Sequence, residues 1–481
     1  MRRFIPILTL LCALAPDAAG AQRTDTLSLS LSDAVNTALR GSDEVRIANA
    51  QVDLAESQLT IARAGVLPQL RFSGSYQHVY ENARGRAVGQ IFFQPNTYTA
   101  NANLSQTLFQ GGREFAASRA AGRLRGAARL TADETRAQLS LDVQRAYLQT
   151  LFAGRVLDIR AASLEQASAR LTQVEQFQNA GRAARYDVLR ARVERANFEP
   201  LVIQARSDVE LATLELKRLL NIPIERPIRL TTVIEPRDIQ GILASVDASQ
   251  ERGEDRASIR AAELTARARR DAVTVARADF FPTVSAFIQW GFAAFPLGGF
   301  PTSSGQIGNS FCPGGSSPDR ICNNGGWFED RFLGVNVSWP LFDGLRTKGN
   351  LDLARAQARL ADAELTRERE AVAVEVAAAR AELERARSLF AARRENATEA
   401  DEAFRLASLR FTRGLGTQLE ISDAQLALLT AQTDEARAIF DLYLASAELA
   451  RALGKPLPMP ALAATGSTTS LPDSSASPND P

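Results

Sequence analysis

Few residues of this chain have the types that carry catalytic or metal chemistry. Among its 481 residues there are one histidine, His78, and three cysteines. A single histidine argues against a histidine acid/base pair and against a His-based metal centre. No phosphate loop, dinucleotide fingerprint, GxSxG elbow or HExxH helix occurs, and nearly all Asp/Glu pairs fall on amphipathic helix faces. The residues therefore predict neither an enzyme nor a resident cofactor.

The cysteines and the first residues indicate export. Residues 1–21 have a basic start, a short apolar stretch and a small-residue cleavage site, as a secretory signal peptide has. Cys12 lies inside this peptide, whereas Cys312 and Cys322 stay in the mature chain. Because exported proteins enter an oxidising compartment, we expect a disulfide between Cys312 and Cys322.

The charge balance excludes a class of partner. The chain has 56 basic and 55 acidic residues, which leaves a net charge of +1. No bulk positive field therefore attracts nucleic acid, and we expect no nucleic-acid partner. After the signal peptide no run of ~18 apolar residues occurs, so the sequence predicts no membrane-spanning helix.

The chain repeats itself, with three matches in the same order. IARAGVLPQLRFSGSY resembles VARADFFPTVSAFIQW, so that Pro68 falls on Pro282. LSQTLFQGGR resembles VSWPLFDGLR, and a later match pairs Gly181 with Gly414, each in a predicted turn between two helices. The offset grows from 214 to 233 between the first two matches, which indicates a longer insertion in the second half. The sequence therefore predicts two structural repeats.

Each repeat is expected to hold a helix, two strands, a long helix and a returning helix. The first repeat, 22–247, is expected to contain strands 68–80 and 97–109, a long helix 113–178, a returning helix 186–221 and a connector 222–247. The second repeat, 248–455, is expected to contain strands 281–293 and 331–342, a long helix 346–412 and a returning helix 418–453. Residues 456–481 are rich in Pro, Ser, Thr and Asp and are predicted to be disordered.

The four strand segments alternate between apolar and polar residues with a period of two. In the first of them Leu70, Phe72 and Tyr76 share one face, while Arg71 and Ser73 share the other. Such alternation over ~10 residues, with aromatics near the ends, is typical of a barrel strand that faces lipid outside and water inside. An ordinary half-buried sheet is the alternative for any one segment, but four such segments in an exported chain favour the barrel.

Four strands cannot close a transmembrane barrel, because an open edge in lipid leaves backbone groups unpaired at a cost of several kcal/mol each. Three chains that give four strands each would make a twelve-stranded barrel. The strand count thus predicts a homotrimer, although other multiples remain open.

The helical stretches are long and have coiled-coil seams. Leu157, Leu164 and Leu171 recur every seven residues, with small apolar residues between them. A periplasmic coiled-coil adaptor or structural protein would explain these seams but not the strands. Pro200 lies inside the first returning helix, where it predicts either a kink or a break.

This arrangement resembles the TolC-like outer-membrane efflux channels of Gram-negative bacteria. The resemblance rests on the duplicated element order, on LFQGG and LFDGL after the second strand of each repeat, and on GLGTQLEISDAQLALLTAQ and AELARALGK near the end. It implies a mixed α/β membrane protein in the outer membrane: a homotrimer with a shared twelve-stranded barrel in outer-membrane lipid and a long helical tunnel in the periplasm. It also implies docking, through a periplasmic adaptor (a membrane fusion protein), on an inner-membrane pump of RND or ABC type. The function implied is an exit duct for efflux or type I secretion.

The resemblance also implies a gate of charged residues at the periplasmic end of the tunnel. By motif match, Glu420 and Asp423 occupy the two acidic positions of the second repeat, and Asp187 the matching position of the first. The plain alternative is that they are ordinary carboxylates in the first turn of a helix, where the helix dipole favours them.

The sequence departs from the family at two positions of this gate. Phe411 stands where some members carry a tyrosine, and Gly416 where they carry an arginine that pairs across the closure. Other cations near the two turns are then candidates for that role: Arg182, Arg185 and Arg413.

Overall fold

The computed structural model describes residues 26–81, 83, 96–232, 253–296, 300 and 327–457. Several predicted features lie outside the described residues. These are the signal peptide, the Cys312–Cys322 disulfide, most of the connector and the C-terminal tail.

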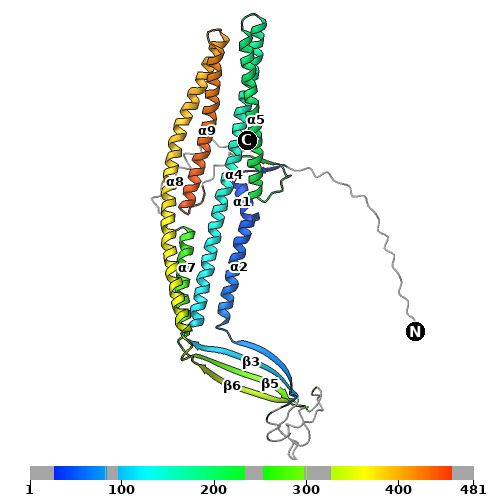
Figure 1. Ribbon diagram of the computed structural model, residues 1–481, viewed down its shortest axis with the longest axis vertical. Coiled ribbons are helices and arrows are strands. Elements are labelled where there is room, and N and C mark those ends of the chain that lie inside the picture. Colours follow the sequence, from blue (N-terminus) through cyan, green and yellow to red (C-terminus); the bar gives the residue numbers. More distant parts are fainter. Residues whose placement is uncertain are drawn as a thin grey trace, which may run out of the picture.

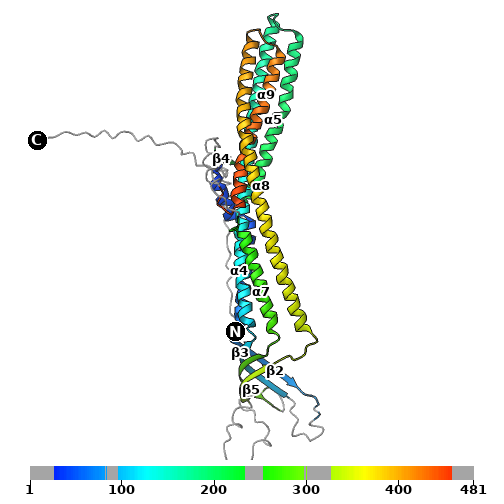
Figure 2. The same ribbon diagram turned by 90° about the vertical axis from the view of Figure 1, so that its left-hand side faces the viewer.

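Two long helical hairpins stand on one small sheet (Figure 1). The first hairpin consists of α4 (Arg113–Asn179) and α5 (Arg185–Leu219), and the second of α8 (Arg346–Thr412) and α9 (Gln418–Ala452). The shorter helices α1 (Leu31–Gly41), α2 (Asp43–Ala64) and α7 (Ala257–Ala278) pack between the hairpins' returning helices and the sheet. The hairpin ends thus lie farthest from the sheet (Figures 1 and 2). In the described part of the chain no helix combines the length and apolarity needed to cross a membrane.

The four predicted strands form one antiparallel sheet. Its members are β2 (Gln69–His78), β3 (Asn96–Gln110), β5 (Thr283–Ala294) and β6 (Trp327–Ser338), in the order β2-β3-β5-β6. A second, two-stranded sheet pairs β1 (Leu27–Leu29) with β4 (Ile228–Leu230) in parallel, beside α1.

One face of the larger sheet is apolar and uncovered within the chain. The side chains of Phe72 and Leu333 are 75% and 81% exposed, and Tyr76, Val335 and Val337 are exposed on the same face. The other face carries most of the polar positions together with Phe287 and Phe332, whereas Arg331 lies on the apolar face. A contiguous exposed apolar surface of this kind marks contact with a membrane or with another protein.

The last strand differs from its predicted bounds. We predicted 331–342, but β6 begins at Trp327, because residues 327–330 pair with the end of β5. It ends at Ser338, where β5 begins opposite it at Thr283, and no strand among the described residues lies on its other side. Its repeat counterpart, β3, continues to Gln110 alongside β5.

The helices repeat with matching lengths. α4 and α8 each have 67 residues, α5 and α9 each have 35, and α2 and α7 each have 22. Pro200 lies within α5, which continues on both sides of it, so the possibility of a helix break there was wrong.

A buried ion network joins four helices where α9 ends and α7 begins. Arg256 precedes α7, and its side chain is only 5% exposed. Its guanidinium contacts Glu375 of α8 and lies 2.6 Å from the Glu134 carboxylate of α4. Arg451 of α9 reaches the same two carboxylates, at 2.5 Å to Glu375 and 3.1 Å to Glu134. Each of the four charges therefore has two opposite partners, and the network joins the two hairpins at the level where α9 ends.

Candidate gate at the hairpin ends

Both hairpins turn through a glycine in the left-handed region. Gly181 has φ 73° and Gly414 has φ 74°, which an L side chain adopts only with strain. After Gly181 the Arg182 amide donates to the Phe177 carbonyl at 2.7 Å, which closes the end of α4. An equivalent bond closes α8, so the turns of the two repeats are built alike.

A hydrogen bond between a side chain and the backbone caps the N-terminus of each returning helix. The Glu420 amide donates to the Thr417 hydroxyl at 3.2 Å, which caps α9. In the first hairpin the Ala184 amide donates to the Asp187 carboxylate at 3.0 Å. Asp187 thus serves the start of α5 within its own chain, as the structural alternative for such a carboxylate predicts.

The two acidic residues of the second repeat lie on the exposed surface of α9, in its first turns. The Glu420 carboxylate is 3.7 Å from the Arg410 guanidinium, and both side chains are largely exposed. Such an exposed pair contributes at most about 1 kcal/mol. Asp423 is exposed one turn later. Sequence reasoning missed Arg410, although a cation ten positions before Glu420 lies directly across the turn.

The structure does not bring the other predicted cations to the carboxylates within one chain. The Arg182 guanidinium lies over the Phe177 ring, 4.9 Å from its centroid. Arg185 and Arg413 are exposed, and neither forms an ion pair with a described residue of this chain. Among the described residues, none of these three arginines therefore pairs with Glu420, Asp423 or Asp187.

The two departures from the family pattern have a local physical basis. A Cβ added to Gly416 would lie 3.2 Å from both the Glu420 carboxylate and the Phe411 amide nitrogen, so there is little room for a side chain. The Phe411 ring packs 6.3 Å from the Phe177 ring of the other hairpin. An aromatic contact therefore joins the ends of the two hairpins.

A buried polar cluster, which sequence reasoning missed, joins the hairpins below these turns. Arg170 of α4 and Glu194 of α5 form an ion pair at 3.1 Å, with side chains only 5% and 15% exposed. From α9, the Ser422 hydroxyl donates to Glu194 at 2.7 Å and the Gln418 amide at 3.4 Å. We call these four residues the latch cluster. Burial lowers the pKa of the Arg170 guanidinium, and the Glu194 charge opposes that shift.

The seam between α9 and the first hairpin stays polar one turn further. The Gln425 amide, in a side chain that is 1% exposed, donates to the Ser163 carbonyl at 2.9 Å. The side-chain oxygens of Gln418 and Gln425 are buried without a hydrogen-bond partner. Because an unpaired buried oxygen is costly, exposure to water would partly offset the loss of this seam. The polar contacts are confined to this part of the seam, because Leu429 of α9 packs one turn further on against Ile159 and Phe198 of the first hairpin.

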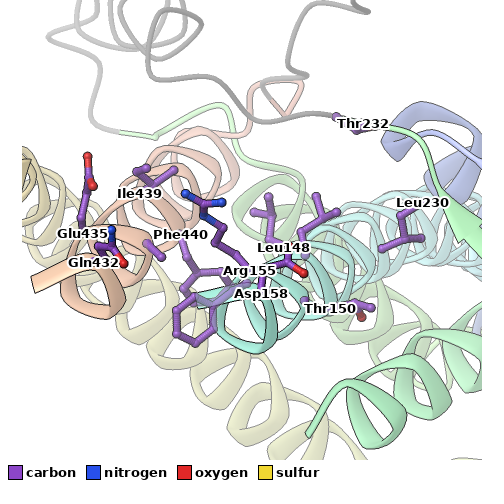
Figure 3. A pocket seen from close by; sticks show the side chains of 14 residues that line it. Leu148, Thr150, Arg155, Asp158, Leu230, Thr232, Gln432, Glu435, Ile439 and Phe440 are labelled. Carbon is purple, nitrogen blue, oxygen red and sulfur yellow. The ribbon is translucent and has the colours of Figure 1, made fainter. Parts of the chain in front are cut away.

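A cavity of about 700 Å³ lies between α4 and α9, beside β4 (Figure 3). Arg155 points into it among Leu148, Phe440 and Ile439, and Glu435 lies at its rim. Burial raises the pKa of the Glu435 carboxyl, and the Arg394 and Arg155 charges partly oppose this shift.

We expect Glu435→Gln to stabilise the protein near pH 8, by roughly 1–2 °C in Tm after allowance for solvent screening. A carboxyl whose pKa is raised by folding destabilises the fold when ionised, and this penalty disappears below its unfolded-state pKa. The gain should therefore vanish near pH 4. Thermal unfolding at both pH values measures it, and an equal gain at both would contradict the assignment.

The comparisons with known proteins agree on one family. The sequence model of the family described as outer membrane efflux protein matches residues 34–221 and 248–455. The chain is 26% identical over 446 residues to the pyoverdine export outer membrane protein OpmQ of Pseudomonas putida, covering 89% of this chain and 86% of that protein. It is 27% identical over 425 residues to the outer membrane protein OprJ of Pseudomonas aeruginosa, covering 85% and 82%.

Solved structures share the fold. The outer membrane protein VceC of Vibrio cholerae superposes with a TM-score of 0.71 at 21% identity, covering 88% of this chain and 96% of that one. The hairpins and the sheet described above therefore form a known architecture, with the sheet and the hairpin ends at its opposite poles.

Proposed function

This chain belongs to the outer membrane efflux protein family, and from that premise we propose that three copies assemble into one channel. Membership makes the protein an outer-membrane exit duct of an efflux system rather than a member of an enzyme family. In the proposal each copy gives four strands to a twelve-stranded barrel in the outer membrane, and the hairpins form a tunnel in the periplasm.

The observation that best supports this proposal is the four-stranded sheet. Among the described residues its strands β2 and β6 are edges without a second partner strand, and its apolar face is exposed. An open edge in lipid would leave backbone groups unpaired at several kcal/mol each, whereas closure with other copies pairs them all. The family match disfavours the periplasmic adaptor, which also has no use for such a sheet.

Partners follow from the proposed position. Family members are the outer-membrane channels of tripartite efflux systems, so the hairpin ends of this chain would meet a periplasmic adaptor and, through it, an inner-membrane pump of RND or ABC type. Export of this kind requires that the ends close when no partner is bound.

The gate is proposed at these ends. If Glu420 and Asp423 face the axis of a trimer, six carboxylates gather at the narrowest point. A ring of like charge in a confined opening attracts cations and repels anions. Asp187, Arg182, Arg185 and Arg413 would then lie at the contacts between copies, where cations of one chain meet carboxylates of the next.

We expect the double variant Glu420→Gln/Asp423→Asn to lose most of the channel's preference for cations and its block by multivalent cations. The reason is the removal of all six axial carboxylates. Reversal potentials in planar bilayers under a KCl gradient measure the preference. Glu402→Gln, on an exposed face of α8, is the control. Wild-type selectivity in the double variant would place the gate elsewhere.

Native mass spectrometry in detergent tests the assembly itself. The proposal predicts a mass of three chains as the dominant species. A well-folded monomer or dimer as the dominant species would overturn it.

A further inference from the structure

A cavity of about 470 Å³ lies where the helices of the first repeat meet the larger sheet. Its walls come from the end of α2, from the residues that lead into β2, and from the first two turns of α4 (Figure 1). The side chains that line it are Arg63, Val66, Leu67, Phe115, Ser118 and Arg119. The cavity lies at the opposite pole from the hairpin ends, so the proposed gate does not use it.

The polar side of this cavity is cationic. Among the described residues no carboxylate lines it, and none pairs with Arg63. Arg119 lies 3.7 Å from the carboxylate of Asp271, but Asp271 has a closer partner in Arg123, at 2.6 Å. The Ser118 hydroxyl adds a donor to the two guanidinium groups. Two arginines and a hydroxyl in one cavity suit the oxygens of a phosphate group.

An acidic residue of the same junction points elsewhere. Glu114 is the acidic residue in the first turn of α4. Its carboxylate occupies the space beside Gly65 that a Cβ would take, and it is not among the side chains that line the cavity. The cavity therefore keeps its cationic lining although a carboxylate lies nearby.

The other side of the cavity is apolar and open to the surface. Leu67 and Phe115 are 61% and 64% exposed, although both are large apolar side chains. The Gln106 side-chain amide donates to the Val66 carbonyl at 2.9 Å. Gln106 lies in the same row across the sheet as Val335, which is exposed on the apolar face. The apolar wall of the cavity thus continues the apolar face of the sheet.

We propose that this cavity binds an anionic membrane phospholipid, with the phosphate on Arg63 and Arg119 and the start of an acyl chain along Leu67 and Phe115. This inference rests on the proposed channel, in which the sheet lies in the membrane, and adds a lipid site at the helix end of the sheet. A free phosphate would leave the apolar wall in water, whereas a phospholipid covers both sides of the cavity. Arginines at the edge of a lipid-facing surface attract anionic head groups.

The second repeat offers an internal comparison. With the repeat offsets of 214 and 233, the counterparts of Val66, Leu67 and Ser118 are Phe280, Phe281 and Leu351. Each counterpart is larger, and Leu351 is buried. The counterpart of Arg119 is Asp352, whose negative charge repels a phosphate. The cationic cavity is therefore a property of the first repeat and does not follow from the shared fold.

Native mass spectrometry of delipidated protein in detergent, titrated with dioleoylphosphatidylglycerol, tests the site. The wild type should bind one molecule per chain. Arg63→Ala/Arg119→Ala should bind it with an apparent affinity at least about tenfold lower, because two charge-assisted contacts are lost. The matched control Arg277→Ala/Lys348→Ala removes two cations at the corresponding place of the second repeat and should bind as the wild type does.

A second variant keeps both arginines. Ser118→Leu introduces the residue that the second repeat has at this position, and the larger side chain should fill the cavity and weaken binding by a similar factor. Wild-type affinity in both variants would overturn the site. An equal loss in the matched control would also overturn it, because general surface charge would then explain the binding.

Two further probes separate a lipid site from simpler ones. Dioleoylphosphatidylcholine, whose head group has no net charge, should bind more weakly, and equal binding would overturn the role of the arginines. Glycerol phosphate, which lacks the chains, should not displace the lipid at equal concentration, and displacement would identify a free-phosphate site instead. The same spectra give the mass of the assembly. A trimer that binds no lipid overturns the site and leaves the channel, whereas a dominant monomer overturns the channel.

Discussion

Replacement of Arg170 by methionine is expected to raise the single-channel conductance in planar bilayers and the time spent in open states. The change removes the only ion-pair partner that the described residues offer Glu194, whose side chain is 15% exposed. Breaking a buried pair from one side costs about 3–5 kcal/mol. Because Glu194 also accepts from Ser422 and Gln418 of α9, much of that cost falls on the contact between the hairpins.

The control for this variant is Arg405→Met. Arg405 pairs with Glu402 on the exposed surface of α8, at 2.6 Å, and joins no second helix. It removes an arginine from the long helix of the other hairpin, at a similar distance from the hairpin end, without touching the latch cluster. Since 1.4 kcal/mol corresponds to a tenfold change in an equilibrium, the open population should rise at least about tenfold in Arg170→Met only. The same conductance and the same open population in both variants would mean that the latch cluster contributes to stability alone.

Replacement of Arg256 by methionine is expected to give the largest loss of stability. Its side chain is 5% exposed and bridges Glu134 and Glu375, which would then share Arg451 alone. Two partly buried carboxylates with one cation repel one another, and we expect a loss of ~3 kcal/mol in the free energy of unfolding. In a chain of this size that corresponds to a fall in Tm of roughly 3 °C.

A matched control exists on the same pair of helices. Arg270 of α7 pairs with Asp362 of α8 at 2.7 Å, but both side chains are exposed. Arg270→Met should lower Tm by less than about 2 °C. Thermal unfolding followed by circular dichroism in detergent compares the two. A similar fall in Tm in both variants would show that burial of the Arg256 network does not increase its contribution to stability.

Helix bounds could be predicted from the sequence because local signals determine them. The long helices end at Gly181 and Gly414, whose positive φ values stop a helix, and the bounds of α8 match their prediction. The bounds of β6 could not be predicted from the sequence, because a strand exists only where a second strand pairs with it. Alternation continues through Leu341, but no strand in the described part of the chain pairs with β6 beyond Ser338.

The latch cluster could not be predicted for a related reason. Arg170 and Glu194 read as members of solvated helix faces, since both belong to rows rich in charge. Only the packing of α9 against the first hairpin buries them. A hint was present: the two residues lie at similar distances on either side of Gly181, so an antiparallel hairpin brings them together. The motif match found acidic residues at the start of α9 but not their partner Arg410.

Planar-bilayer recording of the purified wild-type protein beside Arg170→Met tests most directly that this chain forms a duct closed at its hairpin ends. We expect both proteins to insert as discrete, uniform channels, the wild type with small and mostly closed conductance and the variant with larger and mostly open conductance. If both proteins are correctly folded and insert but neither forms discrete channels, the proposal that the chain forms a duct is contradicted. A wild type already as conductive as the variant would contradict closure at the hairpin ends.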